Sequence, residues 1–178
     1  MSDSTLPAGI GIPKGTEVLA LEQRCRRGGS GLTAAELIGR WRLHQLWSKT
    51  QAQPNAATAA LLRGLKASLS LDAGEEGKLR VLNSVRLGAL QLCFHGHGCL
   101  RGRRPLLEFW FTELELRLGQ QTLWHQAITR QPQPRQRPFF ALIARTGNAD
   151  TGWLLARGRG GGLALWVLEP RPENGRGG

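Results

Sequence analysis

The chain has 178 residues, of which 40% are hydrophobic and 21% charged, which is the size and composition of one globular domain with a sizeable core. This length excludes a multidomain machine, and no apolar run approaches the roughly 18 to 20 residues of a membrane-spanning helix. The formal charge is +11, from 24 Lys and Arg against 13 Asp and Glu, and it attracts nucleic acid, an anionic membrane surface or an acidic protein.

Targeting signals and cysteines bear on the compartment. Residues 1–14 lack the apolar stretch of a signal peptide and the Arg-rich amphipathic helix of a transit peptide, so we expect a soluble chain that is not processed. An odd number of cysteines, in a chain long enough to fold without crosslinks, argues against a disulfide framework. They are Cys25, Cys93 and Cys99. A reducing compartment is the expectation.

The N-terminal part of the chain has helical signals. Apolar residues recur at helical spacing within residues 16–27 and two glycines follow, which predicts a first amphipathic helix. Thr33 and Glu36 have the spacing of a capping box, which predicts a short second helix before Gly39. Asn55 is a candidate cap for a third helix. Its apolar face would consist of Ala57, Leu61 and Leu65.

Beyond the helices, apolar residues alternate with other residues, as they do in half-buried antiparallel strands. The predicted strands are 41–47, 69–71, 79–87, 90–94, 107–111, 114–118, 139–145, 153–157 and 163–168. Short Gly-containing turns join most of them into hairpins, and the proline-rich loop 130–138 interrupts the series.

Strands of this number and spacing usually close into a sandwich or a barrel, and a barrel of about eight strands has room for one small ligand. We therefore predict a mainly β fold, a single antiparallel barrel of about eight or nine strands with a short helical N-terminal region. The domain is expected over residues 16–169. A flexible arm (1–15) would precede it, and a flexible Gly/Arg tail (170–178) would follow it.

The stretch from Cys93 to Cys99 alternates cysteines and histidines and invites a metal-site interpretation. A strand rises about 3.3 Å per residue, so the two cysteines would lie roughly 20 Å apart and could not share one zinc ion. His95 and His97 remain as weak candidate ligands. We expect neither a metal nor another cofactor.

Residues 157–162, Arg-Gly-Arg-Gly-Gly-Gly, resemble the arginine-glycine boxes of RNA-binding proteins. They lack the Gly-Lys-Ser/Thr ending of a phosphate-binding loop, and apolar runs on both sides favour a hairpin turn. No arrangement of nucleophile, base and orienting acid is evident, so we do not expect an enzyme. The chain has six tryptophans and no tyrosine, which indicates either core packing or contact with an apolar ligand or a lipid headgroup layer.

Several segments resemble one family. Residues 37–43, Leu-Ile-Gly-Arg-Trp-Arg-Leu, are similar to the opening Gly-x-Trp strand of the plastid lipid-associated proteins, or fibrillins, and more distantly of lipocalins. Residues 83–86 resemble the family's central Asn-x-Val strand, and residues 94–109 resemble the following pair of strands. Residues 155–168 resemble the closing hairpin. The resemblance covers residues 32–168 in the family's order.

This resemblance implies a lipocalin-like barrel that binds a lipid, a carotenoid or a quinone-type apolar ligand without catalysis. It implies a photosynthetic host and a place peripheral to the thylakoid membrane, on the cytoplasmic side in a cyanobacterial-type member or in the plastid stroma in a eukaryote. A basic surface suits docking on anionic headgroups, and nucleic acid is not an expected partner. Two alternatives stay open: an RNA-binding module that uses the Arg-Gly turns, and a lipocalin-like bilin lyase.

The resemblance also implies that Trp41 lies across one end of the barrel under an arginine. Because Arg157 alternates with two apolar residues of a late strand, we predict that it stacks on Trp41, with Arg159 as second choice. The candidate residues for barrel closure and ligand binding are Gly39, Trp41, Asn83, Arg157 and Arg159. The candidate residues of a ligand cavity are Phe94, Phe109, Phe111, Trp153 and Trp166.

Overall fold

A computed structural model of the chain describes residues 11–47 and 64–170. It contains helices α1 (Gly15–Gly28) and α2 (Ala34–Leu37) and two short 3-10 turns, η1 (Glu75–Gly77) and η2 (Pro134–Gln136). The strands are β1 (Gly39–Trp47), β2 (Ser68–Ala73), β3 (Leu79–Leu87), β4 (Leu90–Arg101), β5 (Leu106–Leu118), β6 (Gln121–Ala127), β7 (Phe139–Gly147), β8 (Gly152–Gly158) and β9 (Leu163–Glu169). Most of the predicted arm and tail, and Asn55, Ala57 and Leu61 of the predicted third helix, lie outside the described residues.

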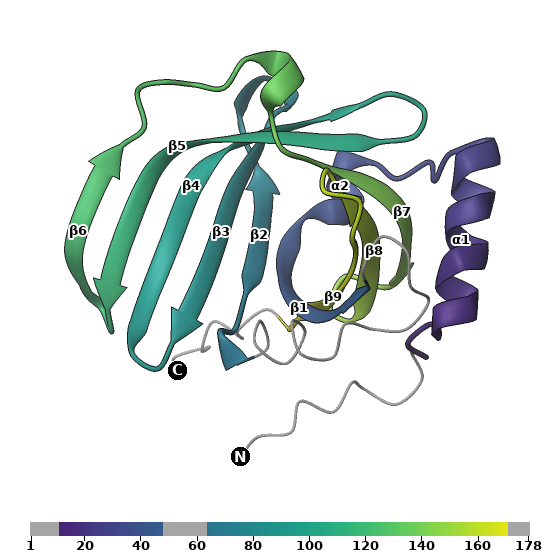
Figure 1. Ribbon diagram of the computed structural model, residues 1–178, viewed down its shortest axis with the longest axis horizontal. Coiled ribbons are helices and arrows are strands. Elements are labelled where there is room, and N and C mark those ends of the chain that lie inside the picture. The colour runs from purple at the N-terminus through teal and green to yellow at the C-terminus, as the bar shows by residue number, and fades with distance from the viewer. Residues whose placement is uncertain (1–10, 48–63, 171–178) are drawn as a thin grey trace, which may run out of the picture.

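The nine strands form one antiparallel sheet in the order β4-β3-β2-β1-β9-β8-β7-β5-β6. A further pairing of β4 with β5 closes eight of them into a ring (Figure 1). The ninth strand, β6, lies outside the ring, because β5 pairs with β7 through residues 106–108 and with β6 through residues 113–118. The predicted mainly β, closed antiparallel fold is confirmed.

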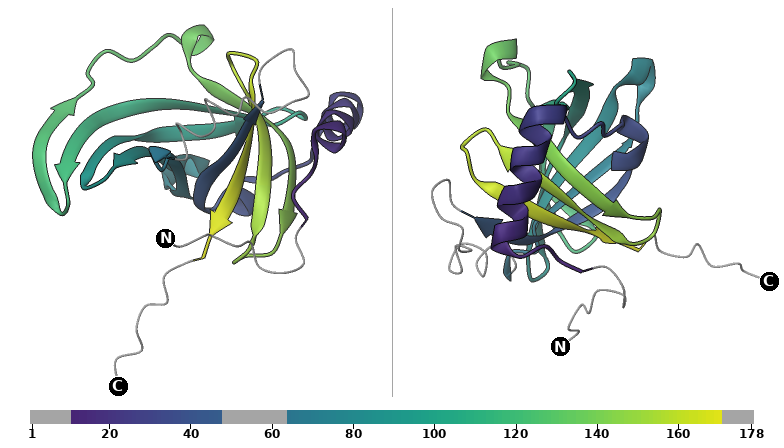
Figure 2. Two further views of the ribbon diagram at one scale, coloured as in Figure 1. Left: turned by 60° about the horizontal axis from the view of Figure 1, so that its bottom comes forward. Right: turned by 90° about the vertical axis from the view of Figure 1, so that its right-hand side faces the viewer.

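On one side the sheet extends as a curved wing, made of residues 82–87 of β3, 90–95 of β4 and 113–118 of β5, together with β6 (Figures 1 and 2). On the other side, α1 lies across the outside of the ring (Figure 2, right). Two apolar clusters result. One fills the ring between its strands, and the other lies between the ring and α1.

The strands that separate these two clusters are apolar on both faces. Along β8, Leu154 and Ala156 belong to the cluster inside the ring, whereas Trp153 and Leu155 belong to the cluster beneath α1. A strand covered on both faces has no polar side that would identify its interior face. The sequence therefore does not show which residues of β8 point into the ring and which point toward α1.

Both described helices begin as predicted. In the capping box of α2, the Thr33 amide and hydroxyl donate to the Glu36 carboxylate at 2.8 and 2.7 Å. These bonds lower the pKa of Glu36. Within residues 11–47 and 64–170, no helix is long and apolar enough to cross a membrane.

Three strand predictions need correction. The strand predicted over 90–94 continues to Arg101, so the whole Cys-His stretch is extended. The strands predicted over 107–111 and 114–118 are one strand, because a bulge at Thr112 absorbs the phase change between their apolar residues. Strand β6 was not predicted, because all its side chains are exposed and no buried face imposes an apolar alternation.

Candidate functional site

Trp41 belongs to the apolar cluster inside the ring. Its side chain is fully buried, and the indole Nε1 donates to the Leu37 carbonyl at 2.8 Å. Gly39 has φ +143°, and a Cβ at this position would lie 2.6 Å from a methyl carbon of Leu168. The Gly-x-Trp sequence therefore fits a tightly packed position, where a larger residue than glycine would clash with Leu168.

The cation over Trp41 is Arg145, not Arg157. The Arg145 Cζ lies 5.7 Å from the centre of the indole ring. A bulge in β7 between Leu142 and Ala144 is the cause, because it turns Arg145 to the same face as its cross-strand neighbour Leu154, inside the ring. Strict alternation along β7 would have placed Arg145 outside.

Arg157, predicted to stack on Trp41, instead faces the helix. It shares its face of β8 with Trp153 and Leu155, and that face is covered by α1. Its Nε and Nη2 donate to the two carboxylate oxygens of Glu22 at 2.6 Å each, and its Nη1 donates to the Gly161 carbonyl. The prediction for Arg157 is wrong because the sequence did not distinguish the two apolar faces of β8.

The second choice, Arg159, also lies away from Trp41. Its guanidinium donates to the carbonyls of Arg137 and Arg135, at 2.8 and 3.0 Å, and holds the proline-rich loop. The turn that contains Arg159 joins β8 to β9, as predicted, and is closed by the Gly158 amide, which donates to the Gly162 carbonyl at 2.9 Å.

The pair Glu22 and Arg157 joins α1 to the ring. Burial by itself would raise the pKa of the Glu22 carboxyl, but the hydrogen bonds from Arg157 and Arg26 outweigh it and leave that pKa below its ordinary value. A bidentate guanidinium-carboxylate contact is among the strongest polar contacts in proteins. The role of Arg157 is therefore to hold the helix.

Four of the five predicted cavity residues gather inside the ring and its wing. They form a row of aromatic rings together with Phe140. The ring centres are separated by 5.2 Å for Phe94 and Phe111, 5.6 Å for Phe111 and Phe109, 5.2 Å for Phe109 and Phe140, and 6.1 Å for Phe140 and Trp166. The fifth, Trp153, lies outside beneath α1, where its Nε1 donates to the Gly11 carbonyl at 3.0 Å.

The row of rings continues onto the inner face of the wing. Phe94 is half-buried there, and its neighbours on the adjoining strands are half-buried as well. The apolar neighbours are Val85, Leu92, Leu114 and Leu116. Asn83 lies opposite Phe94 on this face. The side-chain amide of Asn83 makes no hydrogen bond to any residue in the described part of the chain. The inner face of the wing is thus an apolar surface with one free amide.

The end of the wing carries a group of exposed large hydrophobic side chains, here called the apolar rim. It consists of Leu87, Leu90, Leu118, Leu123 and Trp124, which are between 40% and 63% exposed. The two hairpin turns at this end are joined, since the Gly119 amide donates to the Ala89 carbonyl at 2.8 Å. Sequence reasoning missed the rim, although leucines on both sides of two Gly-containing turns were a visible signal.

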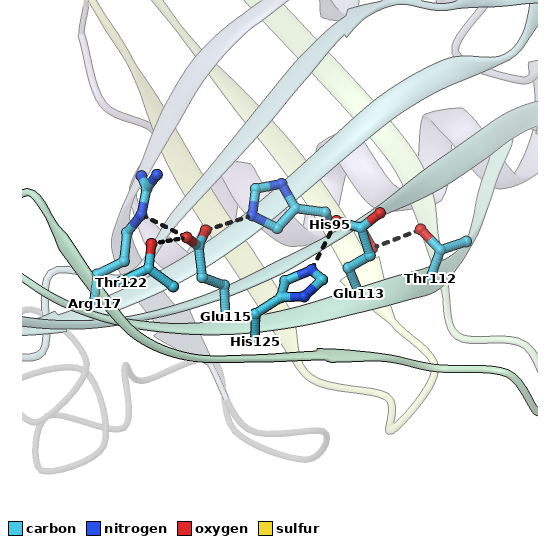
Figure 3. A network of polar contacts seen from close by, with 7 residues as sticks. All are labelled: His95, Thr112, Glu113, Glu115, Arg117, Thr122 and His125. Atoms are coloured by element: carbon cyan, nitrogen blue, oxygen red, sulfur yellow. Dashed lines mark hydrogen bonds and ion pairs between the residues drawn. The ribbon is translucent and has the colours of Figure 1, made fainter.

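The outer face of the wing is polar. Glu115 on β5 accepts hydrogen bonds from Thr122 at 2.5 Å and from Arg117 at 3.0 Å, and it contacts His95 on β4 at 3.2 Å (Figure 3). The bond from Thr122 is the main cause of the lowered pKa of Glu115. His125 and Glu113 form a second contact, at 3.3 Å. This network fastens β4, β5 and β6 to one another.

A metal-ligand set would have to come from the same face. Donor atoms of Cys93, His95 and Glu115 lie within 4.8 Å of one another. Cys93 and His95 are on β4, whereas Glu115 is on the neighbouring strand β5, so residue spacing along one strand did not reveal this acidic group. Glu115 already accepts from two donors, one of them the cation Arg117, which opposes a bound metal ion. His97 instead lies beside Trp110, with ring centres 6.0 Å apart and the rings tilted by 39°.

No family model matches this chain, and no curated protein matches it in sequence. The resemblance to the plastid lipid-associated proteins therefore rests on the quoted residues alone.

Proposed function

We propose that the protein is a non-enzymatic binder of an apolar ligand and docks at the periphery of an anionic membrane surface. The ligand, of the lipid, carotenoid or quinone class, would lie on the inner face of the wing. The apolar rim would enter the membrane. The observation that carries this proposal is the rim itself, five large hydrophobic side chains exposed at two joined turns.

A group of exposed apolar side chains favours binding to another molecule or to a membrane, because such contact removes the apolar surface from water. Complete burial of one leucine contributes roughly 1.5 to 3 kcal/mol. Arg86 and Arg117 directly precede rim residues in the sequence and lie on the polar face of the same strands. A cation near an anionic lipid surface adds about 1 kcal/mol. This combination favours a lipid surface over an apolar protein partner.

Asn83 gives the inner face a means of orienting a ligand. Sites for apolar molecules are mostly hydrophobic, with a few polar groups that fix orientation. We therefore assign the Asn83 amide to the polar end of the ligand, such as a quinone oxygen or a glycerol ester. On the resemblance, we further propose a photosynthetic host and a place on the side of the membrane that faces the cytoplasm or the stroma.

Co-sedimentation with vesicles of phosphatidylcholine containing phosphatidylglycerol tests the membrane proposal. The variant Leu87→Ser/Leu118→Ser should bind at least about tenfold more weakly than the unmodified chain, because two side chains no longer enter the lipid. Leu19→Ser removes a leucine of α1 that is 40% exposed and lies outside the rim, and this variant should bind normally. Binding should also weaken as salt is added.

Equal binding by the rim variant and Leu19→Ser would contradict the membrane proposal. Retention on RNA at low salt, with no affinity for vesicles, would favour the RNA-binding alternative, whose affinity should fall steeply with salt. Transfer of a bilin by the purified protein would favour the lyase alternative.

A further inference from the structure

The outer face of the ring carries a basic pocket between β1, β2 and β3, with a volume of about 200 Å³. We use the name basic pocket for the space lined by Arg40, Arg42, Lys66, Ser68, Ser84, Arg86, Gln91 and Glu169. It lies on the polar face of the sheet, opposite the apolar ligand face. Of its lining residues, the function proposed above uses only Arg86.

The floor of the basic pocket consists of two serines on neighbouring strands. Ser68 and Ser84 are directly opposite each other, each is 3% exposed, and their Oγ atoms are 2.9 Å apart. In that pair one hydroxyl donates and the other accepts. The accepting hydroxyl keeps its own hydrogen, which is available for a third group. The floor thus offers a hydrogen-bond donor at a buried position.

The walls of the basic pocket are cationic. Four cations, Arg40, Arg42, Lys66 and Arg86, surround one carboxylate, that of Glu169, and the net charge is +3. Glu169 lies 2.7 Å from the Nε of Arg40 and 3.6 Å from the Nε of Arg42. It therefore balances a minority of the positive charge.

The other two cations of the basic pocket have no acidic partner within the described chain. Arg86 donates to the neutral Gln91 at 3.2 Å, and no ion pair joins Lys66 to a described residue. Lys66 also has φ +40°, which is uncommon outside glycine. The preceding residue is fixed to β3, because the Leu65 carbonyl accepts from the Arg86 amide at 2.7 Å. The fold thus holds Lys66 beside Arg86 despite their mutual repulsion.

We propose that the basic pocket binds a phosphate group. Guanidinium groups pair with the oxygens of phosphate through parallel N–H donors, and phosphate has enough acceptor oxygens for the serine floor and the cationic walls together. A bound phosphate would neutralise the excess charge that Glu169 leaves. The phosphate could belong to a phospholipid headgroup or to a soluble phosphate ester, and both present the same chemistry to the pocket.

The position of the basic pocket bears on the lipid source. Arg86 directly precedes Leu87 of the apolar rim, and Gln91 directly follows Leu90. A lipid whose acyl chain meets the rim would bring its headgroup close to this edge of the pocket. The headgroup source alone rests on the proposed membrane function, whereas binding of a soluble phosphate does not.

Calorimetric titration with inorganic phosphate at low ionic strength tests the pocket. Saturable binding is expected for the unmodified chain. In Lys66→Gln/Arg86→Gln, Kd should rise at least about tenfold, because two of the four cations are removed. The control Arg80→Gln/Arg103→Gln removes the same net charge from exposed positions outside the pocket lining and should leave Kd within about twofold. Glu169→Gln should lower Kd, because it removes the competing carboxylate.

Two results would overturn the phosphate site: no saturable binding by the unmodified chain, or an equal loss in both double variants. Vesicles containing phosphatidic acid then identify the source. Lys66→Gln alone separates the two sources, because Lys66 lines the pocket and has no part in the proposed membrane docking. If the source is a headgroup, Lys66→Gln should weaken vesicle binding more than Arg103→Gln does, and glycerol 3-phosphate should compete. If the source is soluble, Lys66→Gln should raise the Kd for phosphate and leave vesicle binding equal to that of Arg103→Gln. The rim variant Leu87→Ser/Leu118→Ser should keep its phosphate affinity. Calorimetry therefore tests the phosphate site independently of the membrane proposal, which vesicle co-sedimentation tests.

Discussion

Trp41→Ala is expected to lower the free energy of unfolding by about 3 to 5 kcal/mol, which is the largest single-residue effect that this fold predicts. The indole is fully buried, and its Nε1 donates to the Leu37 carbonyl. Removal leaves a cavity in the cluster inside the ring and a buried carbonyl without its donor. Chemical denaturation followed by circular dichroism measures the loss.

The matched variant for this prediction is Arg145→Ala, which removes the cation from the same ring. Its loss should be about 1 kcal/mol, since the guanidinium lies at the edge of cation-π range and is partly exposed. In a double-mutant cycle the two losses should not add, because each variant removes the same contact. A loss below about 1 kcal/mol for Trp41→Ala would contradict the packing of the indole inside the ring.

Arg157→Leu is expected to cost about 2 to 3 kcal/mol, because it leaves the Glu22 carboxylate beneath α1 with only the exposed Arg26 as partner. Glu22→Leu should cost a similar amount. The double variant Glu22→Leu/Arg157→Leu should be close to the unmodified chain in stability, since two apolar side chains of similar size replace a largely buried ion pair. Additive losses in the double variant would contradict the direct contact.

The pair of Glu22 and Arg157 also predicts a pH dependence. Because the pKa of Glu22 is lowered in the folded chain, its contribution to stability is present above the ordinary carboxyl value of about 4.3 and is lost as the pH falls through the lowered folded value. Denaturation at a series of pH values should show the unmodified chain losing more stability below that point than the double leucine variant does. Parallel curves for the two chains would exclude this contribution.

Period-two patterning predicted most of the strands, because half of the sheet has one apolar and one polar face. Patterning failed at β6, which has no buried face, and it counted β5 twice because Thr112 shifts the phase. Nine strands are expected and nine are observed, but the numbers agree only because the missed strand β6 cancels the double counting of β5.

The site residues show what alternation alone does not supply. Phe94, Phe109, Phe111 and Trp166, predicted as cavity residues, lie on the inner face of the ring and its wing. Alternation did not decide the side for Trp166, because β9, like β8, is buried on both faces. Trp153 and Arg157 were assigned to the wrong side, because α1 gives β8 a second buried face. The basic pocket joins side chains from five strands, β1, β2, β3, β4 and β9, so the register of the sheet brings its cations together.

The central claim, that the apolar rim enters a lipid bilayer, is tested most directly by quenching of tryptophan emission with brominated lipids. Trp124 is the rim tryptophan and is 45% exposed, and Trp124→Phe keeps an aromatic side chain in its place. With both chains bound to anionic vesicles, brominated acyl chains should quench the unmodified chain more than Trp124→Phe, because Trp124 lies among them. Equal quenching of the two bound chains, or no binding by either, would contradict the claim.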